Sequence, residues 1–174
     1  MIIALDPGGT TGYVYWWPDG TYIGGQGDFD YMAELADAWF NMDIDAIVCE
    51  RYTITAETLR KSRQTTALEM IGVAHFVALR KHADFVLQSP ADAKRFSTDD
   101  RLDVVKWREP GQDHFNDACR HLMLYLCKNK LMEVPRTGPQ SPCTCETFGN
   151  GIISGNDGRL EPSEGCPRHA GRNG

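Results

Sequence analysis

The feature that most constrains the fold is a pair of short apolar runs, each of which ends in an acidic residue. Residues 2–5 (IIAL) precede Asp6, and residues 46–49 (AIVC) precede Glu50. Short apolar runs that are rich in β-branched residues are typical of strands buried on both faces. If the two strands are parallel neighbours, Asp6 and Glu50 leave the sheet side by side at its carboxyl end.

The rest of the pattern places these strands in an α/β domain. An aromatic run at 12–17, a turn at 18–20 (PDG) and a return at 21–27 predict an antiparallel meander, and 85–87 predicts a further strand. Helices are predicted from apolar spacing over 31–40, 58–82 and 113–128, and from capping signals at Ser89 and Thr98. These elements predict a mixed central sheet flanked by helices.

The stretch at residues 4–12 (ALDPGGTTG) has two chemically different interpretations. A glycine-rich turn after a strand can hold a phosphate with its backbone N–H groups, as in a nucleotide-binding protein. Alternatively, Asp6 binds a metal ion, as in a nuclease. The glycines then turn the chain out of the strand and leave space for the metal and the DNA backbone.

A second acidic group lies at the start of the last predicted helix. Asp117 follows His114 by three residues and Asp113 by four, so the three share one helix face. A helix packed across the carboxyl end of the sheet would bring Asp117 and His114 to Asp6 and Glu50. Clustered carboxylates repel one another unless a cation is bound, and Mg²⁺ or Mn²⁺ prefers oxygen ligands. Two such ions can support phosphodiester cleavage, and His114 could complete a metal shell or transfer a proton.

Each of these acids also has a purely structural interpretation. An Asp before Pro-Gly commonly forms a turn, and Glu50 can be the exposed end of a strand. Asp113 and Asp117 can complement the dipole of their helix. Their shared location is what favours a metal site.

Several segments, taken in this order, resemble the RuvC-like Holliday junction resolvases, in particular their phage-borne relatives, which belong to the RNase H-like superfold. The segments fall within about residues 1–130 and are ALDPGGTTG, AIVCE, KSRQTTALEMIGVAHFVAL, QSPADAKRF and DHFNDACRHLMLYL. The first motif is common to many proteins. The His114-x-x-Asp117-Ala118 segment makes the resemblance more specific. It implies an RNase H-like nuclease domain over residues 1–134.

The resemblance also implies roles for the acidic residues. Asp6, Glu50 and Asp117 correspond to metal-binding catalytic acids, and His114 occupies a position where members carry His or Asp. Asp113 lies one place earlier and ranks below His114 as a ligand. The family implies two Mg²⁺ (or Mn²⁺) ions, cleavage that leaves a 5′-phosphate, and a role in DNA recombination and repair. It further implies a homodimer that makes two symmetric cuts in a four-way junction.

The charge of the chain departs from this picture. The net charge is −6, whereas nucleic-acid binders are usually basic. Basic residues nevertheless flank the predicted site in two segments and suit phosphate contacts, although ordinary surface charge is the alternative for each. These residues are Arg60, Lys61 and Arg63, then Lys94, Arg95, Arg101, Lys106 and Arg108.

The last segment, residues 135–174, differs in character from the rest. It holds five of the nine prolines and eight of the seventeen glycines, which predicts an irregular tail with a domain boundary near Val134. Soft ligands occur in two close pairs, Cys143 with Cys145 and Cys166 with His169, and suggest a small zinc-binding element. The alternative is a disordered tail. The core family has no such tail.

Two other classes of function stay open. The first motif also resembles the phosphate loop of sugar kinases and actin-like ATPases, although those proteins normally need two such domains. A non-catalytic nucleic-acid-binding module that uses the tail is the other alternative. Apolar runs fall short of a membrane helix and no signal peptide is apparent, so we expect a cytoplasmic protein, in a host cell if it is phage-encoded.

Overall fold

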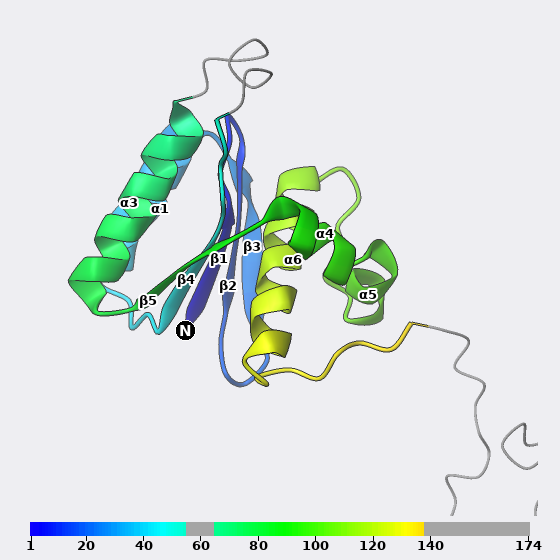
Figure 1. Ribbon diagram of the computed structural model, residues 1–174. Helices are drawn as coiled ribbons and strands as arrows, with labels where there is room; N and C mark the ends of the chain where they lie inside the picture. The colour runs from blue at the N-terminus through cyan, green and yellow to red at the C-terminus, as the bar shows by residue number, and fades with distance from the viewer. Residues whose placement is uncertain (55–64, 138–174) are drawn as a thin grey trace, which may run out of the picture. The chain divides into compact units, whose positions relative to one another are not determined.

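A computed structural model describes residues 1–54 and 65–137 of the 174-residue chain (Figure 1). The strands are β1 (Ile2–Asp6), β2 (Thr11–Trp16), β3 (Tyr22–Gly27), β4 (Ala46–Glu50) and β5 (Asp84–Gln88). The helices are α1 (Phe29–Trp39), α3 (Thr66–Lys81), α4 (Pro90–Phe96), α5 (Asp99–Val104) and α6 (Asp113–Lys128).

The five strands form one mixed sheet in the order β3-β2-β1-β4-β5. The first three strands are an antiparallel meander, and β1, β4 and β5 run parallel to one another. Parallel strands end at the same edge of a sheet, so Asp6, Glu50 and Gln88 all close their strands at one edge. The condition under which Asp6 and Glu50 leave the sheet side by side, that their strands are parallel neighbours, is therefore met.

Helices cover both faces of the sheet, as Figure 1 shows. Alternate residues of β1 point to opposite faces because strand side chains alternate. Ile2 and Ala4 pack with α6, whereas Ile3 and Leu5 pack with residues of α1 and α3. The predicted α/β class with a mixed sheet flanked by helices is therefore confirmed.

Three details differ from the sequence-based expectations or extend beyond them. The helix predicted over residues 58–82 is observed from Thr66 to Lys81, and the part at 58–64 lies outside the described residues. Ser89 does occupy the N-cap position of α4, but its side chain makes no capping hydrogen bond. The strand and helix patterns of the sequence predict that Cys49, Cys119 and Cys127 are packed in the core; Cys49 and Cys119 are buried, whereas Cys127 is only partly buried.

No described helix is long and apolar enough to cross a membrane. The compact unit that contains the sheet spans Met1–Thr137. The boundary near Val134 and the irregular character of residues 135–174 stay predictions, because the structure describes the chain only as far as residue 137.

Gly12 permits a close contact between α6 and the backbone of β2. It pairs with Asp6 across β1 and β2. A Cβ atom on Gly12 would lie 1.9 Å from the backbone oxygen of His114 and 2.6 Å from the backbone nitrogen of Phe115. The first turn of α6 therefore rests directly on the backbone of β2. The space at this glycine, expected from the sequence to admit metal and DNA, is filled by α6.

We predict that Gly12→Ala destabilises the domain by roughly 1–3 kcal/mol or more, because both the helix and the strand backbone would have to move. Urea unfolding followed by circular dichroism measures the change. Gly72→Ala in α3 is the matched control. Among the described residues, nothing lies within 4 Å of its added methyl group, so the substitution should stabilise the helix by about 0.5–1 kcal/mol. Equal stability of Gly12→Ala and the wild type would contradict this account of the contact.

Candidate active site

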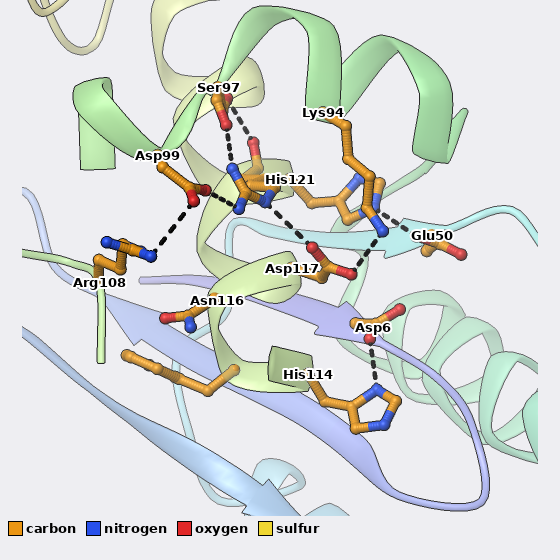
Figure 2. A network of polar contacts seen from close by, with 12 residues as sticks. Asp6, Glu50, Lys94, Ser97, Asp99, Arg108, His114, Asn116, Asp117 and His121 are labelled. Carbon is orange, nitrogen blue, oxygen red and sulfur yellow. Dashed lines mark hydrogen bonds and ion pairs between the residues drawn. The ribbon is translucent and has the colours of Figure 1, made fainter. Parts of the chain in front are cut away.

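The candidate site lies at the carboxyl edge of the three parallel strands, where α6 faces it (Figure 2). The strands contribute Asp6, Glu50 and Gln88. Helix α6 contributes polar side chains from three successive turns at its sheet-facing side, namely His114, Asp117 and His121. Side chains three, four or seven residues apart share one face of a helix, and the contacts described below show that this face of α6 meets the carboxyl edge of the sheet.

Asp6 is the most buried of the acids, with 9 % of its side chain exposed. Its Oδ2 accepts a hydrogen bond of 2.8 Å from Nδ1 of His114. Burial raises the pKa of Asp6 to about 6, and the negative charges of Glu50 and Asp117 act in the same direction, against the hydrogen bond from His114. An ionised Asp6 is therefore costly in this site unless positive charge is brought close to it.

Glu50 is held by a residue that the sequence analysis did not select. Nε2 of His121 donates a hydrogen bond of 3.0 Å to Oε2 of Glu50. The other ring nitrogen, Nδ1, is hydrogen-bonded at 3.0 Å to the side-chain amide of Gln88. His121 has 1 % of its side chain exposed, against 20 % for Glu50. The imidazole is thus a buried link between the ends of β4 and β5.

Asp117 contacts two cationic groups, one at each carboxylate oxygen. Lys94 of α4 donates to Oδ2 at 2.8 Å, and Nε of Arg120 donates to Oδ1 at 3.0 Å. The hydrogen bond to Asp117 raises the pKa of Lys94, and the charges of Asp117, Glu50 and Asp6 raise it further, against the effect of partial burial. All three carboxylates therefore act on the same ammonium group.

Arg120 also joins α6 to the chain between α4 and α5. Its Nη1 donates to the backbone oxygen of Ser97 at 2.5 Å, and its Nη2 forms an ion pair with Asp99. The hydroxyl of Ser97 returns a bond of 2.9 Å to the backbone oxygen of Arg120. This exchange, together with an ion pair from Arg108 to Asp99 at 3.3 Å, fixes the orientation of the guanidinium against Asp117.

Three side chains of α6 orient the three carboxylates in the same way. His114, Arg120 and His121 each bind one oxygen of a carboxylate, on Asp6, Asp117 and Glu50 respectively. Among the described residues, the second oxygens of Asp6 and Glu50 accept no hydrogen bond, while that of Asp117 is bound by Lys94, whose side chain is 57 % exposed. The carboxylates are thus oriented by α6.

Carboxylate oxygens are the donors that Mg²⁺ and Mn²⁺ prefer, and the mutual repulsion of these acids is what a divalent cation would relieve. The chemistry of the donor set therefore fits such an ion. In this arrangement, however, no three His, Cys, Asp or Glu side chains within residues 1–54 and 65–137 are grouped closely enough to hold a metal. Asp117 is drawn towards Lys94, and Glu50 towards His121.

The other sequence-predicted residues are placed as follows. Asp113 is exposed in the first turn of α6. Arg95 pairs with Asp92 of its own helix at 2.8 Å, and Lys106 is exposed. Basic residues Arg60, Lys61 and Arg63 lie outside the described residues, as do the proposed zinc ligands Cys143, Cys145, Cys166 and His169.

Thus Lys94 lies in the site itself, and Arg108 lies beside it through Asp99. Lys94, Arg108 and Arg120 help to line a groove of about 600 Å³ next to Asp117. Arg101 instead donates to the backbone oxygen of Phe96 and lies over the ring of that residue, 4.8 Å from its centroid.

His121, Gln88 and Arg120 were missed in the sequence analysis, yet two of them carried a signal. His121 follows His114 by seven residues, which is about two helical turns. Gln88 ends the strand before Ser89-Pro90, in the position that Asp6 and Glu50 hold on their strands. Arg120 carried no signal for its link to the rest of the fold, because Ser97 and Asp99, its partners outside α6, lie 23 and 21 residues away in the sequence.

No protein-family model and no curated protein sequence matches this chain. Similar solved structures do exist. RuvC of Thermus thermophilus, in complex with a Holliday junction substrate, matches with a TM-score of 0.53 and 13 % identity over 75 % of this chain and 96 % of that one. A second structure of Thermus thermophilus RuvC has a TM-score of 0.52, 13 % identity and the same coverage.

The resolvase of Fowlpox virus, solved with substrate Holliday junction DNA, has a TM-score of 0.52 and 12 % identity over 74 % of this chain and 99 % of that one. At such low identity these matches establish the fold. The chain has a RuvC-like, RNase H-like fold, and the predicted resemblance is confirmed at that level.

We predict that Asp6→Asn stabilises the metal-free protein near pH 7. The pKa of Asp6 is raised from an ordinary 3.8 to about 6, so the folded state binds the proton more tightly than the unfolded state does. The stability of the wild type should therefore fall as pH rises through this window. At pH 7 the variant should gain roughly 2–3 kcal/mol, and the gain should vanish near pH 4.

Urea unfolding in EDTA at several pH values measures this effect. Asp37→Asn, an exposed carboxylate of α1, is the matched control and should show no comparable gain. A variant that is no more stable than the wild type at pH 7 would show that the buried carboxylate is already compensated.

Proposed function

We propose that this protein is a metal-dependent, structure-selective DNA endonuclease that hydrolyses a phosphodiester bond in branched DNA, with four-way junctions as the main substrate. The observation that carries the proposal is the convergence of charge from β1, β4 and α6. Glu50 and Asp117 both raise the pKa of Asp6, and all three acids act on Lys94. The shared fold with resolvases solved on Holliday junctions supports the choice of substrate.

Asp6, Glu50 and Asp117 would hold two Mg²⁺ or Mn²⁺ ions, which would supply activation of the attacking water and charge stabilisation at the leaving oxygen. Burial keeps Asp6 in a fixed position, and α6 orients all three carboxylates. Asp113 is a weaker candidate because it lies exposed at the start of the helix.

His114 is placed to handle a proton. Its Nδ1 is engaged with Asp6 at 2.8 Å, and 44 % of its side chain is exposed. Within the described residues, its Nε2 makes no hydrogen bond, so this atom can exchange a proton with water or substrate. Lys94 has its ammonium on Asp117 and most of its side chain exposed. When a cation takes its place, Lys94 can turn outwards to a DNA phosphate.

DNA contacts on the groove beside Asp117 would involve Lys94 and Arg108, with Arg95 and Lys106 nearer the periphery. Arg60, Lys61 and Arg63 stay predictions for DNA binding, and the tail residues Cys143, Cys145, Cys166 and His169 stay predictions for zinc. Action in recombination or repair, in the cytoplasm of a phage-infected cell, completes the proposal.

The decisive experiment is cleavage of a labelled four-way junction by the full chain, with and without Mg²⁺. We expect Mg²⁺-dependent nicking of the junction in preference to linear duplex. Asp6→Asn and Asp117→Asn should each reduce the rate more than about 100-fold, since replacing even a partner of a metal ligand typically costs 10–100-fold. Asp37→Asn, on the far face of the sheet, is the control and should cut normally.

Three outcomes would contradict the proposal. Cleavage by both site variants at the wild-type rate would show that another centre does the chemistry. ATP binding without any cleavage would instead favour the actin-like or sugar-kinase-like alternative, and junction binding without cleavage by the wild type would favour a non-catalytic module.

Two symmetric cuts in a junction require two active sites, so we propose a homodimer. Helix α3 exposes apolar side chains in a row that could form its interface. Leu68, Phe76 and Leu79 are 41 %, 55 % and 63 % exposed, and the ring of Phe76 meets that of Phe40 at 6.1 Å between centroids.

We predict that Phe76→Glu converts a dimer into a monomer, because a charge in the centre of an apolar interface is costly to desolvate. Sedimentation velocity at micromolar concentration measures the change. Val104→Glu on α5, which is 47 % exposed on the other side of the sheet, should leave the dimer intact. A wild-type monomer that cuts both strands of a junction would contradict the proposed assembly.

A further inference from the structure

Of the two histidines in the site, His121 is the more deeply buried. It is 1 % exposed and lies on α6, four residues after Asp117 and seven after His114. Both of its nitrogens are used, Nε2 on Glu50 and Nδ1 on Gln88, each at 3.0 Å. Glu50 and Gln88 are register partners on neighbouring parallel strands. One imidazole therefore connects a helix to the ends of two strands.

The arrangement determines the orientation of Glu50. A carboxylate accepts hydrogen bonds only, so the Nε2 atom that faces it must carry the proton. The amide oxygen Oε1 of Gln88, also an acceptor, lies 3.0 Å from Nδ1, so contacts at both ring nitrogens restrict rotation of the imidazole. His121 is packed inside the domain and cannot move with the side chain of Glu50. Oε2 of Glu50 is therefore held in one position, and Oε1 is directed away from the imidazole.

We propose that His121 is a positioning residue that fixes Glu50 for the binding of a divalent cation through its other oxygen, with Gln88 holding the ring. The inference rests on the proposed function, since it assigns His121 a part in the same centre. It predicts that His121 controls cation affinity without touching the cation. Partners of this kind typically contribute 10–100-fold to metal affinity.

The experiment measures Mn²⁺ binding to the full chain by calorimetry, in parallel with thermal unfolding. His121→Leu replaces the imidazole donor by an apolar side chain of similar size. We expect this variant to bind Mn²⁺ 10–100-fold more weakly than the wild type. His121→Gln restores an N–H donor near the position of Nε2 and should bind Mn²⁺ within about 3-fold of the wild type, by the same reasoning. His75→Gln, an exposed histidine of α3, is the matched control.

A double-mutant cycle separates positioning from a general structural effect. In a Glu50→Gln background, His121→Leu should cause no further loss of Mn²⁺ affinity, because there is no longer a carboxylate to orient. An equal loss in both backgrounds, or unchanged Mn²⁺ affinity in His121→Leu, would overturn the inference while leaving the proposed nuclease intact. Absence of Mn²⁺ binding by the wild type would overturn both.

If His121→Leu does not fold, the wild-type protein still decides the matter. The Nε2–H proton of His121 is buried and hydrogen-bonded, so it should be visible in a ¹⁵N-edited NMR spectrum and should shift on titration with Mg²⁺. The same titration of Glu50→Gln should leave that resonance in place. A Mg²⁺ titration that saturates at the acids but leaves the His121 signal unchanged would overturn the inference.

Discussion

The contact between the first turn of α6 and the backbone of β2 is the constraint that places the side chains of α6 at the edge of the sheet. The contact is possible only because residue 12 has no side chain, as the backbone of His114 occupies the space where a Cβ would be. Gly12 is also the register partner of Asp6. The strand paired with the one that carries Asp6 is thus in direct contact with the helix that carries Asp117.

Electrostatic repulsion among the three carboxylates is the second constraint. Side chains of the protein itself compensate for it by donating hydrogen bonds to these acids. Asp6 is forced into an environment that favours its neutral form. Asp117 is balanced by Lys94 and Arg120, and Glu50 by His121. Only Lys94 among these partners is largely exposed. A newly arriving cation would therefore displace one mobile ammonium group and leave the buried donors in place.

Much of the fold and part of the site could be predicted from the sequence. The rest could not be predicted, for physical reasons. The runs IIALD and AIVCE predicted two buried strands, because short apolar runs rich in β-branched residues are typical of them, and the structure shows that the two are parallel neighbours. Helix α6 was predicted from Asp113 to Lys128, as observed, because its apolar spacing is strong. Arg120 contacts Ser97 and Asp99, and Gln88 at the end of β5 contacts His121 of α6; these are tertiary contacts between segments far apart in the sequence, which no local spacing rule predicts. The role of Gly12 was misjudged for the same reason, since only the packed structure shows which backbone fills its space.

The spacing of residues along α6 also matches the spacing of the parallel strands that the helix crosses. Seven residues of helix advance about 10.5 Å, and two strand spacings measure roughly 9.6 Å. The step from His114 to His121 consequently matches the step from the end of β1 towards the ends of β4 and β5. One inserted residue between them would rotate the second histidine by about 100° around the helix axis. The distance between the ends of the parallel strands therefore constrains the number of residues between His114 and His121. The chemistry of the site constrains which residues stand at these two positions.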